Sequence, residues 1–191
     1  MREAARLRAA PRPVAAFYAR AWWTAVRTRD RFTLDSASRP SDVVNLLALA
    51  EGQVATVELG TGTAWTTIAL ALADDRRRVL SYDPVVRAER DRYLELVPPA
   101  TRERIELYAT PAEEATPPAG SVGFLFIDCA HYRKETADAF RAWEAAVAPA
   151  GVVAFHDYDH PVYPGVREAV EELGLAGEVA GGVFVWRKPA A

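Results

Sequence analysis

Two glycines and two carboxylates in the first half of the chain are spaced as in a nucleotide-binding site. Gly60 and Gly62 follow the apolar stretch 54–58, which ends in Glu58, and precede a second apolar run. Glycines let the backbone approach a ligand without a Cβ in the way, and the amides of a helix that begins at such a turn point at the ligand. Asp83 follows about twenty residues later, where nucleotide-binding α/β units place a carboxylate that holds ribose hydroxyls.

The turn departs from the dinucleotide-binding pattern at two positions. Trp65 stands where that pattern has a third glycine or an alanine for close approach to a pyrophosphate, and Glu58 would repel the pyrophosphate. A phosphate-free ligand with positive groups fits both departures, and S-adenosyl-L-methionine has an ammonium, a sulfonium and a ribose. The residues therefore favour S-adenosylmethionine over a nicotinamide dinucleotide, and both over a turn that binds nothing. The cofactor-binding residues predicted here are Glu58, Gly60, Thr61, Gly62 and Asp83.

Acidic residues and histidines follow two later apolar runs. Asp128 comes directly after the run 122–127, and Asp157 comes two residues after the run 152–155. Ligands of open α/β sheets sit at the carboxyl ends of the strands, so we expect these side chains to share one site with all three histidines of the chain, His131, His156 and His160. Two carboxylates can hold a hard divalent cation, which would lower the pKa of a bound hydroxyl.

Apolar periodicity predicts the elements that position these residues. Short apolar runs indicate buried strands, and the glycine turn leads into a helix. Pro40 marks a boundary after the turn-like stretch 32–40, Ser41 can cap a helix that stops at Gly52, and Pro98 ends another helix. The predicted strands are 54–58, 79–82, 105–108, 122–127, 152–155, 178–180 and 183–186, and the predicted helices are 43–50, 65–73, 84–97, 132–147 and 164–173.

The first forty residues differ from the rest in charge. They carry nine Arg against three acidic residues, a balance of +6, which leaves 14 basic and 23 acidic residues, or −9, for the remainder. Such an acidic body does not indicate a nucleic-acid-binding protein. Apolar residues recur with helical spacing over 14–26, including Phe17, Tyr18, Trp22 and Val26. This stripe predicts an amphipathic helix that covers either its own domain or a second subunit.

Several motifs together resemble one family. Residues 58–62 resemble the first motif of class I S-adenosylmethionine-dependent methyltransferases, and residues 82–84 resemble the second. Residues 126–132, 148–158 and 164–169 resemble the branch that contains macrocin-type sugar O-methyltransferases and the methyltransferase-like partner of cephalosporin hydroxylation. The resemblance covers roughly residues 41–191. It implies a Rossmann-like, doubly wound, mostly parallel seven-stranded sheet with a C-terminal antiparallel hairpin.

The resemblance also implies roles for the residues that follow the fourth and fifth strands. In that branch an aspartate binds a metal and a histidine three residues later is the general base, and Asp128 and His131 match these positions. An acidic pair usually completes the metal site, and here the pair is His156 and Asp157. This departure either argues against the metal, Mg²⁺ or Mn²⁺, or shifts it towards a cation that accepts imidazole, such as Mn²⁺ or Fe²⁺. His156 is either a ligand or a core histidine.

Three further expectations come from the same family. The loop after the third strand lies against the adenine ring, which adds Thr110 and Ala112 to the cofactor-binding residues, and Asp128 borders the cofactor as well. Extra N-terminal helices often cover the active site or build a dimer, so we expect residues 1–40 to form a lid or a homodimer contact on a methyltransferase domain of residues 41–191. The helix predicted over 14–26 is compatible with both a lid and a dimer contact.

The predicted function is O-methylation of a hydroxylated small molecule in secondary metabolism. A protein that binds S-adenosylmethionine without methylating, as a partner or regulator, is one alternative, and an NAD(P)-dependent oxidoreductase is the other. No apolar run reaches the ~18 residues that span a bilayer, and the start lacks the apolar stretch of a secretory signal. The single cysteine, Cys129, forms no internal disulfide. We therefore expect a cytoplasmic protein without membrane or nucleic-acid partners.

Overall fold

Seven strands form one sheet in the computed structural model, which describes residues 5–115, 118–129 and 131–190. They are β1 (Ala55–Leu59), β2 (Arg78–Tyr82), β3 (Ile105–Tyr108), β4 (Val122–Ile127), β5 (Val147–Phe155), β6 (Glu178–Ala180) and β7 (Val183–Arg187). Their order is β3-β2-β1-β4-β5-β7-β6. The first five strands are parallel, and β7 runs antiparallel between β5 and β6. The predicted Rossmann-like fold with its C-terminal antiparallel hairpin is confirmed.

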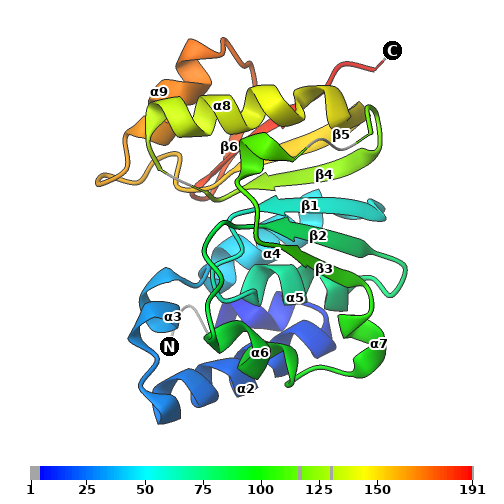
Figure 1. Cartoon of the computed structure of the whole chain (residues 1–191), viewed down its shortest axis with the longest axis vertical. Coiled ribbons are helices and arrows are strands. Elements are labelled where there is room, and N and C mark those ends of the chain that lie inside the picture. The colour runs from blue at the N-terminus through cyan, green and yellow to red at the C-terminus, as the bar shows by residue number, and fades with distance from the viewer. Residues whose placement is uncertain (1–4, 116–117, 130, 191) are drawn as a thin grey trace.

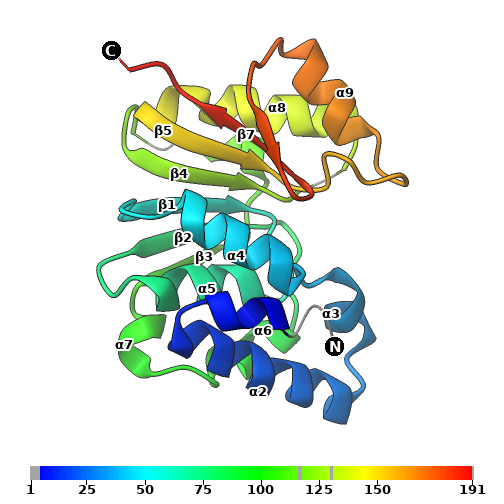
Figure 2. The same cartoon turned by 180° about the vertical axis from the view of Figure 1, so that it is seen from behind.

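Helices cover both faces of the sheet (Figure 1, Figure 2). One layer consists of α2 (Arg12–Thr28), α4 (Pro40–Leu49), α5 (Trp65–Ala73), α6 (Glu89–Leu94) and α7 (Pro99–Arg102), and the other of α8 (Arg133–Trp143) and α9 (Gly165–Glu172). Phe124 and Phe126 of β4 face the first layer, while Leu125 and Ile127 face the second. This alternation follows from the two-residue period of a strand. All of β4 is buried, as the continuous apolar run predicted.

The parallel register brings the ends of four strands side by side. Leu59 at the end of β1 pairs with Tyr82 of β2 and with Ile127 of β4, and Ile127 pairs with Phe155 of β5. The residue that follows each of these positions therefore lies at the same edge of the sheet. Those four residues are Gly60, Asp83, Asp128 and His156.

An aromatic cluster attaches α2 to the first helix layer. The ring of Trp65, the first residue of α5, lies 6.1 Å from Phe17, 5.4 Å from Tyr18 and 5.3 Å from Tyr93, all edge to face. Such arrangements each contribute about 0.5–1.5 kcal/mol beyond the burial of their area. Trp65, which occupies the third-glycine position of the turn, is thus an anchor between α2, α5 and α6.

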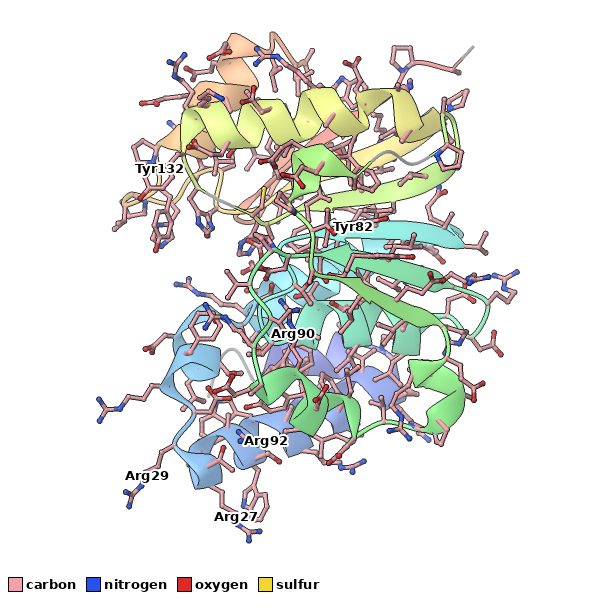
Figure 3. The ribbon with its side chains drawn as sticks, in the orientation of Figure 1. Arg27, Arg29, Tyr82, Arg90, Arg92 and Tyr132 are labelled. Atoms are coloured by element: carbon pink, nitrogen blue, oxygen red, sulfur yellow. The ribbon has the colours of Figure 1, made fainter. Side chains whose placement is uncertain are left out.

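The domain itself covers only part of the apolar stripe predicted on α2. Val14, Phe17, Tyr18, Ala21 and Ala25 are buried, whereas Trp22 and Val26 are 60 % and 46 % exposed. Arg27 and Arg29 extend from the end of α2 away from the body of the protein (Figure 3). The homodimer through this helix stays a prediction. No helix in the described part of the chain combines the length and the apolar content needed to cross a bilayer.

Two predictions before β1 are wrong. Residues 31–36 form a helix, α3 (Arg31–Ser36), within the stretch expected to be turn-like. The side chain of Asp30 caps this helix by accepting a hydrogen bond of 3.0 Å from the amide of Thr33, which stabilises an N-terminus by about 1 kcal/mol. Ser41 does not cap α4, because α4 begins one residue earlier at Pro40, whose fixed φ suits the first helical position.

Two predicted helices are also shorter than expected. The helix over 84–97 is limited to α6, because Asp83 accepts the amide of Val85 at 2.8 Å and turns the chain into a loop. The helix over 132–147 ends at Trp143. A short 3₁₀ turn follows it, η3 (Glu144–Ala146), and Val147 already pairs with Val122 as part of β5. Further short 3₁₀ turns are η1 (Leu7–Ala9) and η2 (Ala112–Glu114).

Candidate active site

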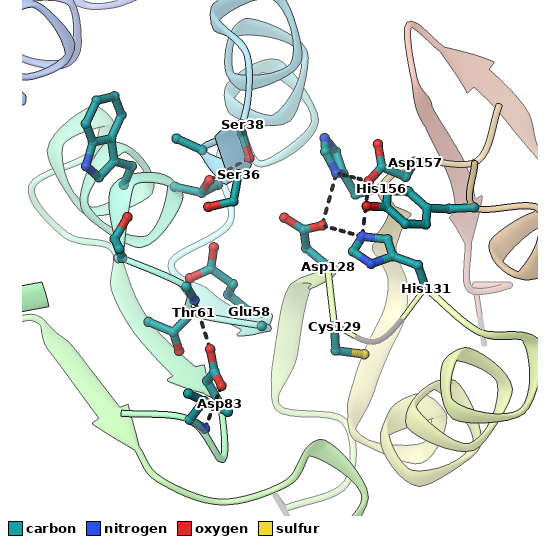
Figure 4. Close-up of a pocket in the computed structure, with 18 of the residues that line it drawn as sticks. Ser36, Ser38, Glu58, Thr61, Asp83, Asp128, Cys129, His131, His156 and Asp157 are labelled. Atoms are coloured by element: carbon teal, nitrogen blue, oxygen red, sulfur yellow. Dashed lines mark hydrogen bonds and ion pairs between the residues drawn. The ribbon is translucent and has the colours of Figure 1, made fainter. Parts of the chain in front are cut away.

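A cavity of 1080 Å³ lies at the carboxyl ends of the strands. One side holds the glycine turn, Glu58 of β1 and Asp83 after β2, and the other holds the acids and histidines after β4 and β5 (Figure 4). The segment 32–42 and the loop 157–163 supply further walls. Thr110 is not among the residues that line the cavity, although the next residue, Pro111, is. The other predicted residues all line it: Glu58, Gly60, Thr61, Gly62, Asp83, Ala112, Asp128, His131, His156 and Asp157.

The glycine turn packs directly on the end of β4. Gly60 has a φ of 101°, in the left-handed region, and a Cβ built on it would lie 2.1 Å from the carbonyl oxygen of Asp128. Only glycine fits this position, because the obstacle is backbone. Gly62 has a φ of 50° but open space around it. Because neither Gly60 nor Gly62 has a side chain, the backbone of the turn is directly accessible from the cavity.

Asp83 lies beside this turn and is already hydrogen-bonded. Its Oδ2 accepts the amide of Gly62 at 2.9 Å and lies 2.9 Å from Nη2 of Arg90, while Oδ1 accepts the amide of Val85. Arg90 is buried and donates to the carbonyl oxygens of Gly62 and Val85 at 2.8 and 2.6 Å (Figure 3). Asp83 and Arg90 thus hold the turn in shape. Sequence reasoning missed Arg90, which lies on α6 without any motif.

Glu58 is a buried acid without a basic partner. Its side chain is 1 % exposed, and it accepts hydrogen bonds from the hydroxyls of Ser81, at 2.7 Å, and Thr67. No Lys, Arg or His of the described chain forms an ion pair with it. Burial raises the pKa of Glu58 to about 8 against the effect of these two hydrogen bonds. A positively charged ligand group in the cavity would find an unpaired carboxyl here.

Asp128, His131 and Asp157 form a group that could hold a metal ion. Each offers one ligand atom, and these atoms lie within 4.8 Å of one another. His131 Nε2 is 3.1 Å from Asp157 Oδ2 and 3.8 Å from Asp128 Oδ1 (Figure 4). Carboxylate oxygens with imidazole nitrogen suit Mn²⁺ or Fe²⁺ better than Mg²⁺.

His156 reaches the same cluster from the end of β5. Its Nδ1 lies 3.0 Å from Asp128 Oδ1 and 3.5 Å from Asp157 Oδ2. Neighbouring strand residues normally point to opposite faces, but Asp157 has a φ of 54°, which ends the strand geometry. Both side chains therefore face the cavity. Nδ1 of His156 is buried and makes no well-angled hydrogen bond despite these short distances.

The cluster shifts the pKa of each member. Asp128 and Asp157 raise the pKa of His131 to about 9. Burial acts against the charge of Asp128, Asp157 and His156. The histidines nevertheless hold the pKa values of both carboxyls below their usual range, and the carboxylates hold that of His156 well above 6.5. In this arrangement His131 keeps its proton at neutral pH.

An aromatic stack and one glycine hold the segment that carries His131. The ring of Tyr163 stacks between His131 and His160, with centroids 4.3 and 4.6 Å away. A Cβ on Gly165 would lie 2.6 Å from the carbonyl oxygen of His131 and from the amide nitrogen of Arg133. The start of α9 therefore packs on the backbone of this segment, and no motif in the sequence revealed that contact.

The wall before β1 is tied to the glycine turn by a buried network. Asp30 accepts hydrogen bonds from the hydroxyls of Thr33, at 2.7 Å, and Tyr93, at 2.6 Å. The hydroxyl of Thr33 also lies 3.2 Å from that of Thr63, next to the turn. Sequence reasoning missed this wall, although the spacing of Asp30 and Thr33 is that of a helix cap. The cavity-lining residues it contributes are Phe32, Asp35, Ser36, Ala37, Ser38, Arg39 and Asp42.

Known proteins show the same fold. A methyltransferase from Geobacter sulfurreducens is 20 % identical, with a TM-score of 0.65 over 93 % of this chain and 90 % of that chain. The O-methyltransferase TomG of Streptomyces achromogenes, solved with S-adenosylmethionine, is 18 % identical, with a TM-score of 0.63 over 82 % and 83 %. CalS11, a TDP-rhamnose 3'-O-methyltransferase of calicheamicin biosynthesis, is 14 % identical, with a TM-score of 0.57 over 76 % and 78 %.

The family follows from the sequence match. Residues 57–158, more than half of the chain, match the model of a methyltransferase domain. The chain belongs to this methyltransferase family, which confirms the family predicted from its motifs. No curated protein matches the sequence at a significant level. The matched range contains the glycine turn and the Asp128 cluster but neither the wall at 32–42 nor the hairpin of β6 and β7.

Proposed function

We propose that the protein transfers the methyl group of S-adenosylmethionine to a hydroxyl group of a small molecule. The observation that carries the proposal is Glu58, a buried acid that lines the cavity beside a glycine turn and has no basic partner in the described chain. An ammonium or sulfonium group near Glu58 supplies that partner and favours its ionised form. A pyrophosphate would instead add negative charge beside it, which disfavours a nicotinamide dinucleotide.

The strand order supports one orientation for the cofactor. Because β1 lies between β2 and β4, Gly60 separates Asp83 on one side from Asp128 on the other. If the ribose lies near Asp83 and the adenine near Ala112, the methionine part of the ligand points towards Glu58 and Asp128. The reacting methyl group then faces the half of the cavity that holds the histidines.

Asp128 and Asp157 would hold a divalent cation in that half. The carboxylate oxygens of Asp128 and Asp157, which lie within 4.8 Å of one another, and the buried Nδ1 of His156 that lacks a well-angled hydrogen bond fit such an ion. A bound Mg²⁺ or Mn²⁺ would lower the pKa of the acceptor hydroxyl.

His131 is the proposed base. The acceptor oxygen forms a bond to the methyl carbon while the bond from carbon to sulfur breaks, and the hydroxyl proton passes to His131. Asp128 and Asp157 keep His131 protonated in the free protein, so this role requires that the two carboxylates share their charge with a cation. Alignment of the reactants contributes about 7–11 kcal/mol to such a reaction, and a base about 10²–10⁴-fold.

The proposal of a hydroxylated acceptor is supported by the structurally similar proteins, and the cavity walls indicate which residues would contact it. TomG and CalS11 are named as O-methyltransferases, of tomaymycin synthesis and of TDP-rhamnose, which supports a hydroxylated acceptor of secondary metabolism here. The residues that would face it come from outside the glycine turn, namely Phe32, Arg39, His160 and Tyr163.

Calorimetric titration with S-adenosylhomocysteine tests the cofactor. We expect micromolar binding, about −8 kcal/mol, to a protein freed of metal with a chelator and to one supplied with Mn²⁺. Incubation with S-adenosylmethionine and a panel of catechols, phenols and sugars, followed by mass spectrometry, then tests methyl transfer. Binding without transfer to any acceptor would favour a non-methylating partner protein. Absence of binding, together with quenching of tryptophan fluorescence by NADH, would overturn the proposal in favour of an oxidoreductase.

A further inference from the structure

A third carboxylate lies beside His156, on the side of the ring that faces away from Asp128 and Asp157. Its Nε2 lies 3.6 Å from Oδ2 of Asp42, a residue in the first turn of α4. Asp42 belongs to the segment before β1 and lies outside the range matched by the methyltransferase family. Both side chains are largely buried, with 12 % and 14 % of their surface exposed.

The two nitrogens of His156 therefore face different surroundings. Nδ1 points at Asp128 and Asp157 without a well-angled hydrogen bond. Nε2 points at Asp42, whose carboxylate forms no other ion pair in the described chain. Histidines that bind metals commonly have this arrangement: one nitrogen binds the ion, and the other donates its proton to a carboxylate that fixes the tautomer.

The backbone holds His156 in place for this role. Its amide donates to the carbonyl oxygen of Ile127 at 3.0 Å, and its ring packs edge to face on Phe126 at 5.8 Å. His131 is in a different position: it is more exposed, at 31 %, and follows the end of β4 by several residues. His156, which is held by its backbone and faces Asp42, suits the role of a metal ligand. His131, which is more exposed, suits contact with an acceptor.

We infer that Asp42 positions His156 so that Nδ1 of His156 binds the divalent cation together with Asp128 and Asp157. Asp42 is a positioning residue, because it acts through His156. His156 is a neutral ligand at a position where the resembled family usually has a carboxylate. The carboxylate of Asp42 supplies a negative charge behind the imidazole ring instead of directly on the cation. The inference rests on the metal part of the proposed function, and it leaves His131 to take the proton of the acceptor.

Binding of Mn²⁺, followed by electron paramagnetic resonance, tests the inference without any acceptor. We expect Asp42→Asn to weaken Mn²⁺ binding about 10–100-fold, the range for residues that orient a metal ligand, and Asp42→Glu to restore part of the affinity. Asp35→Asn is the matched control, since Asp35 lines the same cavity and has no histidine partner in the described chain. His156→Asn should weaken binding and remove one imidazole nitrogen from the electron spin echo modulation of the bound Mn²⁺.

The outcomes separate this inference from the proposed function. Wild-type affinity for Mn²⁺ in Asp42→Asn, or an unchanged imidazole signal in His156→Asn, overturns the role of Asp42 and His156 alone. Failure of the wild-type protein to bind Mn²⁺ overturns both the inference and the metal part of the function. Binding of S-adenosylhomocysteine, measured on the same variants, decides the cofactor independently. Unchanged thermal unfolding midpoints exclude loss of the fold as the cause.

Discussion

The α-carbon of Gly60 packs on the carbonyl group of Asp128, at a distance that leaves no room for a Cβ. The glycine turn and the residue that begins the proposed metal site are therefore in direct backbone contact. A change that moves one of them moves the other. Five predictions rest on this contact and on related ones.

Substitution Gly60→Ala should disturb both halves of the cavity. The new Cβ would lie 2.1 Å from the Asp128 oxygen, so the end of β1 or of β4 must shift. We expect a lower unfolding midpoint and loss of binding to S-adenosylhomocysteine in calorimetry. Gly52→Ala is the control, because Gly52 also has a positive φ, of 74°, but open space, and should cost only about 1–2 kcal/mol. Equal effects of the two variants would contradict the close-packing argument.

Glu58→Gln should flatten the dependence of stability on pH. Glu58 titrates near 4.5 when exposed and near 8 in the folded protein, so between these values the folded state binds more protons than the unfolded state. The free energy of unfolding therefore falls as pH rises, by at most about 1.4 kcal/mol per pH unit for this group. We expect urea unfolding between pH 5 and 9 to show a smaller decline for Glu58→Gln.

The same variant should bind S-adenosylhomocysteine less well. Loss of a hydrogen bond to a charged group weakens binding by about 1.5–3 kcal/mol, which is roughly 10–150-fold. Glu51→Gln, at an exposed site in the turn after α4, should change neither quantity. Parallel pH curves for wild type and Glu58→Gln would show that Glu58 does not carry the raised pKa.

Asp83→Ala and His131→Ala should separate binding from turnover. Asp83→Ala removes the acceptor for the amide of Gly62 and leaves buried Arg90 without its ion pair, so affinity for S-adenosylhomocysteine should fall. His131→Ala should leave that affinity unchanged and reduce methyl transfer about 10²–10⁴-fold, measured with an acceptor found in the panel. Normal cofactor binding by both variants would place the ribose elsewhere.

Gly165→Ala should impair methyl transfer while the cofactor still binds. A Cβ there meets the backbone of His131 and Arg133 at 2.6 Å, so the segment that carries His131 must move, whereas the glycine turn is not among the groups nearest to this Cβ. Gly174→Ala, at the other end of α9 with open space around it, serves as the control. A Gly165→Ala protein with full activity would show that the position of His131 does not matter.

Sequence patterns predicted the central layer of the fold better than its edges. The strands and the helix α5 follow from apolar runs bounded by glycine and proline, and the parallel order placed Gly60, Asp83 and Asp128 at one edge. The helix predicted over 84–97 failed because its first residues form a loop fixed by Asp83, an interaction of one side chain with the backbone. Periodicity carries no information on such contacts.

The candidate site was predictable where it depends on strand ends and not where it depends on long-range packing. Asp128, His131, His156 and Asp157 converge as expected. The roles inferred for Arg90 and Asp42 depend on helices that only the tertiary structure brings to the cavity, and neither residue lies in a motif. The left-handed backbone conformation of Asp157 could not be predicted from the sequence either, although it is the reason why His156 and Asp157 both face the cavity.

The aromatic cluster around Trp65 has a consequence for synthesis of the chain. Phe17 and Tyr18 leave the ribosome long before Tyr93, which follows Tyr18 by roughly 75 residues. At ~5–20 residues per second this delay is roughly 4–15 s. Throughout that time the aromatic cluster on the apolar face of α2 lacks Tyr93, even after Trp65 has been made, so a nascent chain shorter than residue 93 should be a preferred client of ribosome-associated chaperones.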